Sequence, residues 1–428
     1  MEGLSTDKAP SLSVVLPHFV FAGIAFMVLS VMVVLSSDLF STHFYQPKLL
    51  AITHVFVLGW ASMIIIGSLY QLIPVVFETA LFSERLAKFN FWFFAFGVIY
   101  FTYSFWMGNL VNGVPWASIF TFTSFILFGI NVIMSTKKAE KKTFSSKFVI
   151  ASIWWLMATA IQGIVLAFNY KYQYLNDSDF KFLRIHAHFG FVGWFLLLIM
   201  GVASVLVPMF LVSHQLDENK LKRAYYSVNM GLLLLSLNWY FFSNAFATLA
   251  AWVIIMLGIV FYLSFIYDSY KKKLRKLDVG MKHSLTAFAI IILPIVLALL
   301  ASLQHDFSIT IIKNVVLLYG FSIFFGFMTT LILGQTYKTL PFIIWLDRYT
   351  QYIGKRKIPM PREIYNETFA DAQLYIYLVF VILFFVGIIL SNTLVLKVGS
   401  LFLLLTAILY NINVFKIVFH KVKPEKSE

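Results

Sequence analysis

The chain has 428 residues, none of which is cysteine, and few of which are charged. Without cysteine it has no disulfides, no thiolate metal ligands and no covalent attachment of haem through sulfur. Only 12% of the residues are charged, whereas 60% are hydrophobic. A soluble domain of this size has too little interior to bury so much apolar surface. The composition therefore predicts an integral membrane protein that lies in a lipid bilayer.

Two further absences narrow the class of protein. The first residues, which include Glu2, Asp7 and Lys8, lack the basic start and the small-residue cleavage site of a signal peptide, so the first apolar run is expected to be a retained helix. All 19 acidic residues fall in predicted loops or at predicted helix ends. Ion-coupled transporters and proton pumps usually need a carboxylate within the membrane, so this absence argues against both.

Apolar stretches of membrane-spanning length recur along the whole chain, and about 20 residues are needed to span a bilayer. They predict an all-α integral membrane fold, a single polytopic domain, with twelve transmembrane helices. The expected helices are Val14–Ser36, Leu50–Phe77, Phe89–Met107, Trp116–Met134, Phe148–Phe168, His186–Val212, Ala224–Phe242, Ala245–Tyr267, Ser284–Ser302, Ile309–Tyr337, Ala372–Leu390 and Leu394–Val414.

Basic residues divide the loops into two sets. The net charge is +14, but the charges lie in short loops between apolar runs, which argues against a nucleic-acid partner. All but six of the 33 basic residues fall on one side of the predicted membrane. The six exceptions are Lys48, Lys171, Lys181, Arg184, Lys313 and Lys397. This asymmetry predicts a bacterial-type plasma (inner) membrane protein with both termini in the cytoplasm.

One pattern occurs three times. His54 is followed by Gly59, Trp60, Gly67 and Pro74, and His188 is followed at the same intervals by Gly193, Trp194, Gly201 and Pro208. A third copy contains Phe321, Gly326, Phe327, Gly334 and Pro341, so that Phe replaces both His and Trp. The copies are 134 and 133 residues apart, which predicts three pseudo-repeats of four helices, approximately 14–134, 148–267 and 284–414.

The pattern has a physical reading at each position. Glycine lets a helix approach a neighbour or a flat ligand closely, and proline near the inner end kinks or ends a helix. Packing alone would explain both. A buried histidine in a membrane is costly, and its default interpretation is functional, although a structural histidine bonded to a neighbouring backbone is the alternative.

Three histidines lie at the outer ends of parallel predicted helices. His186 and His188 are two residues apart and therefore point about 200° away from each other on a helix, so they cannot both face one site. Two histidines from different helices are an axial ligand pair for haem b. Because they share the same motif position, His54 and His188 are the preferred pair. His186 is assigned to a second haem or metal.

The other histidines are given less weight. His43 and His305 are expected in outer loops, and His18 at the inner end of the first helix. His214, His283 and His420 border basic inner stretches, which predicts that they are solvated or contact lipid headgroups. Trp60 and Trp194 either pack on a macrocycle or fill space between helices. Tyr70 and Ser204 either line a cavity or bond to neighbouring helices, and the second role is the more common.

The stretch IHAHFGFVGWFLLLIMGVASVLVPMF resembles the H-x-H-x4-GW-x6-G helix of the haem-copper oxidase superfamily, in particular its cbb-type and nitric-oxide-reductase branches. The stretch HVFVLGWASMIIIGSLYQLIPVV is similar to the same signature, and the twelve-helix NnrS family carries a related frame. The resemblance implies an oxidase subunit I-like fold, haem b, and a role in electron transfer, nitric oxide or oxygen handling, or respiratory support with redox partner proteins. Copper is a second metal that the resemblance implies.

The chain also departs from that family. Catalytic oxidase subunits carry haem ligands on the tenth helix, where this chain has Phe321 and no histidine. They also carry copper-ligating histidines on the seventh, which here reads SVNMGLLLLSLNWYFF. A usual haem-copper centre is therefore incomplete. Two alternatives follow: a cofactor-poor relative that acts in metal or haem handling, sensing or assembly, and a secondary transporter, which the four-helix period disfavours.

Overall fold

The computed structural model describes residues 8–139, 143–175, 180–302 and 309–422, and all regular secondary structure in these ranges is helical. Eight long helices are uninterrupted: α1 (Leu12–Leu35), α4 (Glu84–Trp106), α5 (Gly113–Thr136), α6 (Phe144–Tyr172), α9 (Glu218–Phe241), α10 (Ala245–Lys271), α15 (Glu367–Leu390) and α16 (Thr393–Val418). Helices α11 (Val279–Ile290) and α12 (Ile292–Ser302) follow each other with a break at Ile291. Short 3₁₀ turns complete the structure: η2 (Ser37–Ser41), η8 (Thr350–Tyr352) and η9 (Pro361–Ile364).

Three rods each contain a π-helical segment between two α-helices. They are α2 (Pro47–His54), η3 (Val55–Ser62) and α3 (Met63–Phe77); α7 (Lys181–His188), η5 (Phe189–Leu196) and α8 (Leu197–Leu211); and α13 (Ile309–Phe321), η7 (Ser322–Met328) and α14 (Thr329–Tyr349). In each rod the π-helical segment begins directly after the first motif residue, which is His54, His188 or Phe321. A π-helical turn widens the helix by one residue and is frequent at functional sites.

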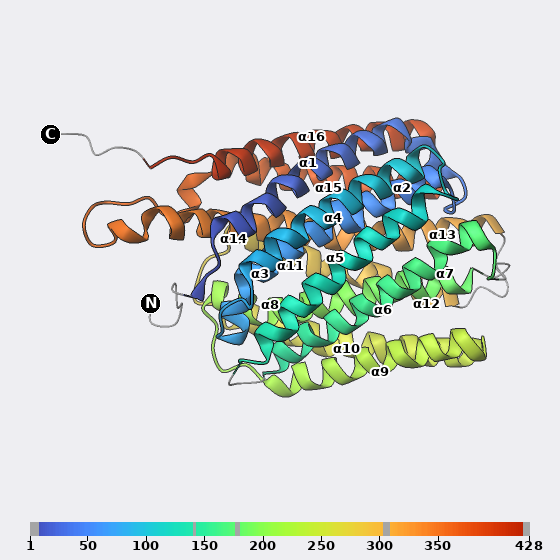
Figure 1. Ribbon diagram of the computed structural model, residues 1–428, viewed down its shortest axis with the longest axis horizontal. Helices are drawn as coiled ribbons and strands as arrows, with labels where there is room; N and C mark the ends of the chain where they lie inside the picture. Colours follow the sequence, from blue (N-terminus) through green and yellow to red (C-terminus); the bar gives the residue numbers. More distant parts are fainter. Residues whose placement is uncertain (1–7, 140–142, 176–179, 303–308, 423–428) are drawn as a thin grey trace.

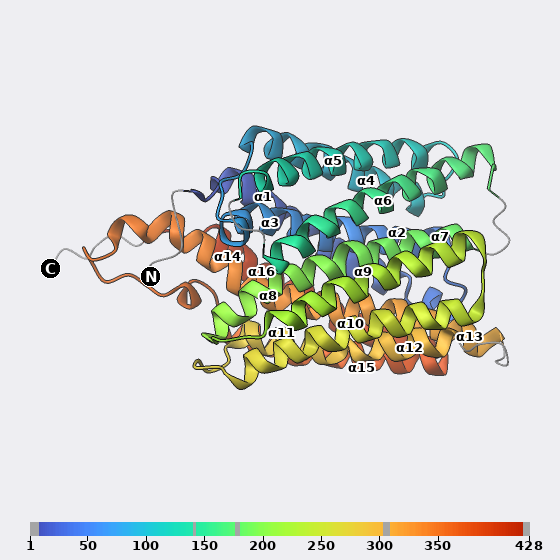
Figure 2. The same ribbon diagram turned by 90° about the horizontal axis from the view of Figure 1, so that it is seen from below.

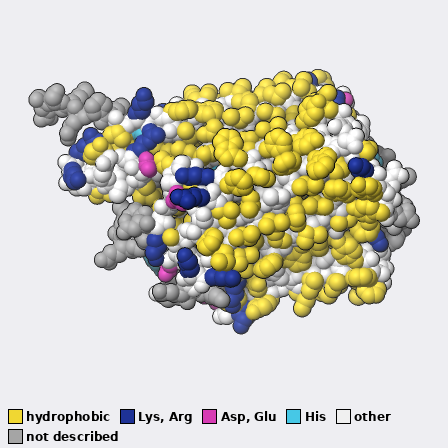
Figure 3. All heavy atoms as spheres, viewed as in Figure 1, with side chains coloured by type: hydrophobic (Ala, Val, Ile, Leu, Met, Phe, Trp, Pro, Cys, Tyr) yellow, Lys and Arg dark blue, Asp and Glu magenta, His cyan; other side chains and the backbone are white. Residues whose placement is uncertain are grey.

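The helices run side by side along the long axis of the molecule (Figures 1 and 2). Among the described residues, ten helices are long and apolar enough to cross a membrane by length and composition. Large apolar side chains such as Trp92 and Phe246 are 70% and 80% exposed. Figure 3 shows that hydrophobic side chains cover most of the face seen in that view, while Lys and Arg gather mainly at the end where α1 begins. This distribution is consistent with an integral membrane protein.

The prolines of the pattern lie inside their helices. The sequence predicts that these prolines kink or end their helices, and α3 and α8 do end a few residues past Pro74 and Pro208. The predicted helix end at Tyr337 is wrong, because α14 continues through Pro341 to Tyr349 and projects beyond the bundle (Figures 1 and 2). A charged residue is accommodated in this helix, since Lys338 is ion-paired with Asp278 at the start of α11.

The motif glycines bring helices into contact. A Cβ atom on Gly193 would lie 2.5 Å from the Cβ of Trp155 on α6. One on Gly59 would lie 3.2 Å from the Cβ of Ala25 on α1. Each of these glycines therefore faces a neighbouring helix, and a side chain would clash with α6 at Gly193 and make a tight contact with α1 at Gly59.

Candidate functional site

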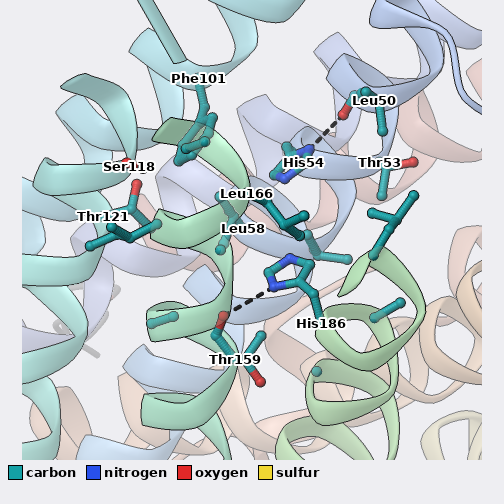
Figure 4. A pocket seen from close by; sticks show the side chains of 18 of the residues that line it. Leu50, Thr53, His54, Leu58, Phe101, Ser118, Thr121, Thr159, Leu166 and His186 are labelled. Carbon is teal, nitrogen blue, oxygen red and sulfur yellow. Dashed lines mark hydrogen bonds between the residues drawn. The ribbon is translucent and has the colours of Figure 1, made fainter. Parts of the chain in front are cut away.

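A cavity of about 250 Å³ lies between the first two π-containing rods and helices α4, α5 and α6. His54 and His186 both line it, and Figure 4 shows the two imidazoles on opposite elements. His54 is the last residue of α2, and His186 lies in the last turn of α7. Each histidine is therefore fixed at the junction between an α-helix and a π-helical segment.

The His54 ring is held by its own helix and by two aromatic rings. Its Nδ1–H donates to the carbonyl oxygen of Leu50 at 2.7 Å. The ring stacks on Phe101 and Phe105 of α4, with centroid distances of 5.2 and 4.8 Å. Because a carbonyl oxygen only accepts, Nδ1 carries the proton and Nε2 of the neutral imidazole keeps its lone pair.

His186 is held by helix α6. Its Nδ1–H donates to the carbonyl oxygen of Thr159 at 3.0 Å. Gly163 leaves room for the ring, because a Cβ atom there would lie 3.0 Å from the imidazole Cε1. The same argument as for His54 leaves the lone pair on Nε2.

The two imidazoles thus have the same electronic arrangement in one cavity. Neither Nε2 atom has a hydrogen bond in the part of the chain that the structure describes. Metal-ligating histidines typically donate their other ring N–H to a backbone carbonyl or a carboxylate, as both of these histidines do. The pair can therefore supply two nitrogen ligands.

The remaining lining of the cavity is neutral. Apolar and aromatic side chains dominate, and no Lys, Arg, Asp or Glu lines it among the described residues. The other polar groups are the amide of Asn169 and the hydroxyls of Tyr45, Thr53, Ser62, Ser118, Thr121, Thr159 and Tyr170. In the described ranges no group of three or more His, Asp or Glu side chains could hold a metal ion. A ligand in this cavity must therefore be satisfied by two imidazoles, weak hydrogen bonds and apolar contacts.

His188 does not face this cavity. Its Nδ1–H donates to the carbonyl oxygen of Arg184 at 2.7 Å, and its Nε2 accepts a hydrogen bond from the Tyr319 hydroxyl at 3.2 Å. Trp239 and Trp252 pack against its ring edge to face. The structure therefore brings His54 together with His186, whereas His188, the partner preferred from the sequence, lies in another part of the bundle with both nitrogens bonded.

The aromatic and glycine positions of the motif have separate surroundings. Trp194 lines the cavity and donates from Nε1 to Ser62 Oγ at 3.3 Å. Trp60 is fully buried elsewhere, stacked on Phe26 of α1 with centroids 4.3 Å apart. Gly59 and Gly193 face α1, α4 and α6 and do not line the cavity.

Polar residues deeper in the rods bond to neighbouring helices, as predicted. Tyr70 accepts from Asn90 Nδ2 on α4 at 3.1 Å. Ser204 and Ser145 of α6 share a hydrogen bond of 2.6 Å. These bonds connect each rod to the helices beside it.

The remaining histidines are spread over the molecule. The expectation that His283 is solvated is wrong, because it is fully buried against α14, where a Cβ atom on Gly334 would lie 2.4 Å from its Cβ. His18 occupies the matching position against Gly67 of α3. His214 is exposed, as predicted. His420 bonds through Nε2 to the Tyr349 hydroxyl at 2.7 Å. His305 lies outside the described residues.

The sequence did not indicate that an aromatic group of residues lines the rim of the cavity. The hydroxyls of Tyr45 and Tyr170 share a hydrogen bond of 2.9 Å, and both residues line the cavity beside Phe180. Tyr45 and Phe180 are in edge contact at 5.2 Å. These residues lie in loops or at helix ends outside the repeated pattern, so no motif marked them.

Comparison with known proteins gives a limited relationship. No protein-family model matches the chain. A 67-residue segment is 34% identical to the Cbb3-type cytochrome c oxidase subunit CcoN1 of Stutzerimonas stutzeri, and it covers 15% of this chain and 14% of that protein. The chain thus matches only a small part of this relative. The match supports a relationship to haem-copper oxidases and nothing finer.

Proposed function

We propose that the protein binds one haem b in the outer half of the membrane, and that the imidazoles of His54 and His186 would hold it. The observation that carries this proposal is the pair of imidazoles in one cavity, each with Nδ1–H bonded to a backbone carbonyl and with Nε2 unbonded. Two histidines from different helices are a suitable axial set for haem iron. This proposal keeps His54 from the sequence prediction and replaces His188 by His186.

The donor set fits a haem better than it fits a bare divalent ion. Structural zinc takes four ligands, and a 2+ charge is costly in a cavity without carboxylates. Haem would bring four ring nitrogens of its own and could accept the two imidazoles as further ligands. At about 250 Å³ the cavity is somewhat smaller than typical ligand pockets of about 300–1,000 Å³, so the flanking rings of Phe101 and Phe105 must move to admit a macrocycle.

We further propose an oxidase subunit I-like scaffold of twelve transmembrane helices in three repeats, in a bacterial plasma membrane with both termini inside. Helices α4 and α9, with 23 and 24 residues, are long enough to bring the ten candidate spans to twelve. A cavity of about 100 Å³ between the three rods supports the repeat. It is lined by five positions on each rod that are related by 134 and 133 residues, the first being Ile64, Leu198 and Leu331.

A haem held by two imidazoles supplies a one-electron redox centre. The role proposed is therefore electron transfer, nitric oxide or oxygen handling, or respiratory support with a redox partner protein. Phe321 occupies the third motif position, where a further histidine would be required for a complete oxidase centre.

Metal handling by the same pair is the second candidate. The neutral lining and the modest volume of the cavity would also suit a small guest of low charge, such as Cu(I). In this case the protein is a cofactor-poor relative that acts in copper handling, sensing or assembly.

The deciding experiment is the visible spectrum and metal content of the purified full-length protein. The haem proposal predicts a Soret band and close to one iron per chain. Copper in similar amount without a Soret band would favour the second candidate, and neither metal in protein purified from cells supplied with haem and copper would contradict both.

A further inference from the structure

A second cavity, of about 60 Å³, lies between the second and third rods and is built from the same positions as the first. All of its lining residues except Phe195 correspond to residues that line the first cavity. Corresponding residues are 134 positions apart between the first and second rods and between α5 and α10. They are 135 positions apart between α6 and α11–α12, and 133 between the second and third rods. The two cavities are therefore equivalent compartments of a repeated scaffold.

The two compartments also correspond in the pair of polar side chains that face each other. His54 in the first compartment corresponds to His188 in the second, and His186 corresponds to Tyr319. His188 and Tyr319 are hydrogen-bonded to each other at 3.2 Å, so the second pair leaves no ring nitrogen for a ligand. The partner that faces each motif residue thus comes from the next rod, two positions before its own motif residue.

The compartments differ in bulk at the matching positions. Ser118 of the first corresponds to Trp252 of the second, and Gly190 corresponds to Ile323. Val57 likewise corresponds to Phe191. A Cβ atom on Gly190 would make only an ordinary van der Waals contact with Thr159, at 3.5 Å, so a methyl group can be added there without a clash. The larger residues are sufficient to explain why the second cavity is smaller.

The third compartment, between the third and first rods, contains rings. Phe321 stands at the motif position, and its facing position is Ile52. Phe321 stacks on Phe384 at 5.3 Å, and Phe56 contacts Phe324 at 4.6 Å. Both compartment-facing positions are thus apolar, and no polar ligand atom remains at either.

We infer that only one of the three equivalent compartments is a ligand site, and that Ser118 and Gly190 are the residues that determine its capacity for a flat, bulky, largely apolar ligand. The inference takes the identity of that ligand from the proposed function, but the capacity itself is a property of the chain. Both residues act through volume, since replacement by the side chains of the second compartment would fill the space beside His54 and His186.

The absence of cysteine permits a test that does not depend on haem. Thr121 lines the first cavity and Ile255 is its counterpart in the second. Thr121→Cys and Ile255→Cys in the full chain are treated with small methyl methanethiosulfonate and with bulky N-(1-pyrenyl)maleimide. We expect both reagents to modify Thr121→Cys, whereas only the small one modifies Ile255→Cys.

Exchanging Ser118 and Gly190 with their counterparts Trp252 and Ile323 should reverse this labelling pattern. Addition of Ser118→Trp and Gly190→Ile to Thr121→Cys should reduce pyrene labelling at least tenfold while labelling by the small reagent continues, which also shows that the site is still present. Addition of Trp252→Ser and Ile323→Gly to Ile255→Cys should give pyrene labelling. If the double variant fails to fold, the single substitutions Ser118→Trp and Gly190→Ile are tested in its place, with the same expected loss of pyrene labelling.

Unchanged pyrene labelling of the filled first compartment, or equal labelling of both compartments in the parent variants, would overturn the inference. The outcome is separable from that of the proposed function. A protein without haem that shows the expected labelling pattern contradicts only the haem proposal. Retention of full haem content by the Ser118→Trp/Gly190→Ile variant contradicts only the capacity inference.

Discussion

The imidazole of His188 has both nitrogens bonded, whereas His54 and His186 each have one nitrogen in the cavity without a hydrogen bond to any described residue. This difference was invisible in the sequence, where His54 and His188 share a motif position and therefore seemed a pair. His54 and His188 do not face each other because they occupy equivalent positions in successive repeats. Residues related by a repeat occupy equivalent compartments, so the residue that faces His54 is contributed by the next rod at a different motif position, which is His186.

The bond between Tyr319 and His188 should stabilise the fold and leave the first cavity unaffected. Tyr319→Phe removes the hydroxyl and leaves a buried acceptor unbonded, which is expected to lower the free energy of unfolding by about 1–3 kcal/mol. Thermal unfolding in detergent measures the change. Ligand content of the purified variant should equal that of the wild type, and its loss would contradict the separation of the two compartments.

At the scale of elements, the close packing at the repeated glycines was predictable, because a small residue every few turns indicates close helix packing. The π-helical segments were not predictable, since a π-helical turn arises from the fit between neighbouring helices and has no residue signature. The length of α14 was missed because Lys338 and Pro341 indicate a helix end, whereas an ion pair with Asp278 accommodates the charge.

Gly193 should be far less tolerant of substitution than an uncrowded helical glycine. A Cβ at Gly193 would lie 2.5 Å from the Cβ of Trp155, so Gly193→Ala is expected to cost about 1–3 kcal/mol of stability. Gly320→Ala on α13 is the matched control, because nothing lies within 4 Å of a Cβ there. Equal unfolding temperatures for the two variants would contradict the packing role of Gly193.

For the whole molecule, the prediction from composition was the most secure, since a chain with 60% hydrophobic residues has few alternatives to a membrane. The number of spans depends on α4 and α9, which are not among the ten candidate spans. Helix α4 contains Glu84, Arg85 and Lys88 in its first turns, and its remaining residues include Asn90 and several Trp, Tyr, Ser and Thr side chains, all of which lower its hydropathy. Sidedness is therefore the property to measure.

Single cysteines in the cysteine-free chain report that sidedness. Asn112 precedes α5 and Lys222 lies near the start of α9, and both side chains are exposed. If α4 spans the membrane, a membrane-impermeant maleimide added to intact cells should label Asn112→Cys and should label Lys222→Cys only after the cells are opened. Labelling of neither residue in intact cells would place Asn112 inside and contradict the twelve-helix arrangement.

The most direct test of the shared site is the low-temperature electron paramagnetic resonance spectrum of the oxidised protein and of two histidine variants. With His54 and His186 as axial ligands, the wild type and His188→Ala should both give the low-spin signal of a six-coordinate haem. His186→Ala should lose this signal, either with a high-spin five-coordinate signal in its place or with the loss of haem. A low-spin signal that persists in His186→Ala and disappears in His188→Ala would contradict the account and would restore the His54–His188 pair.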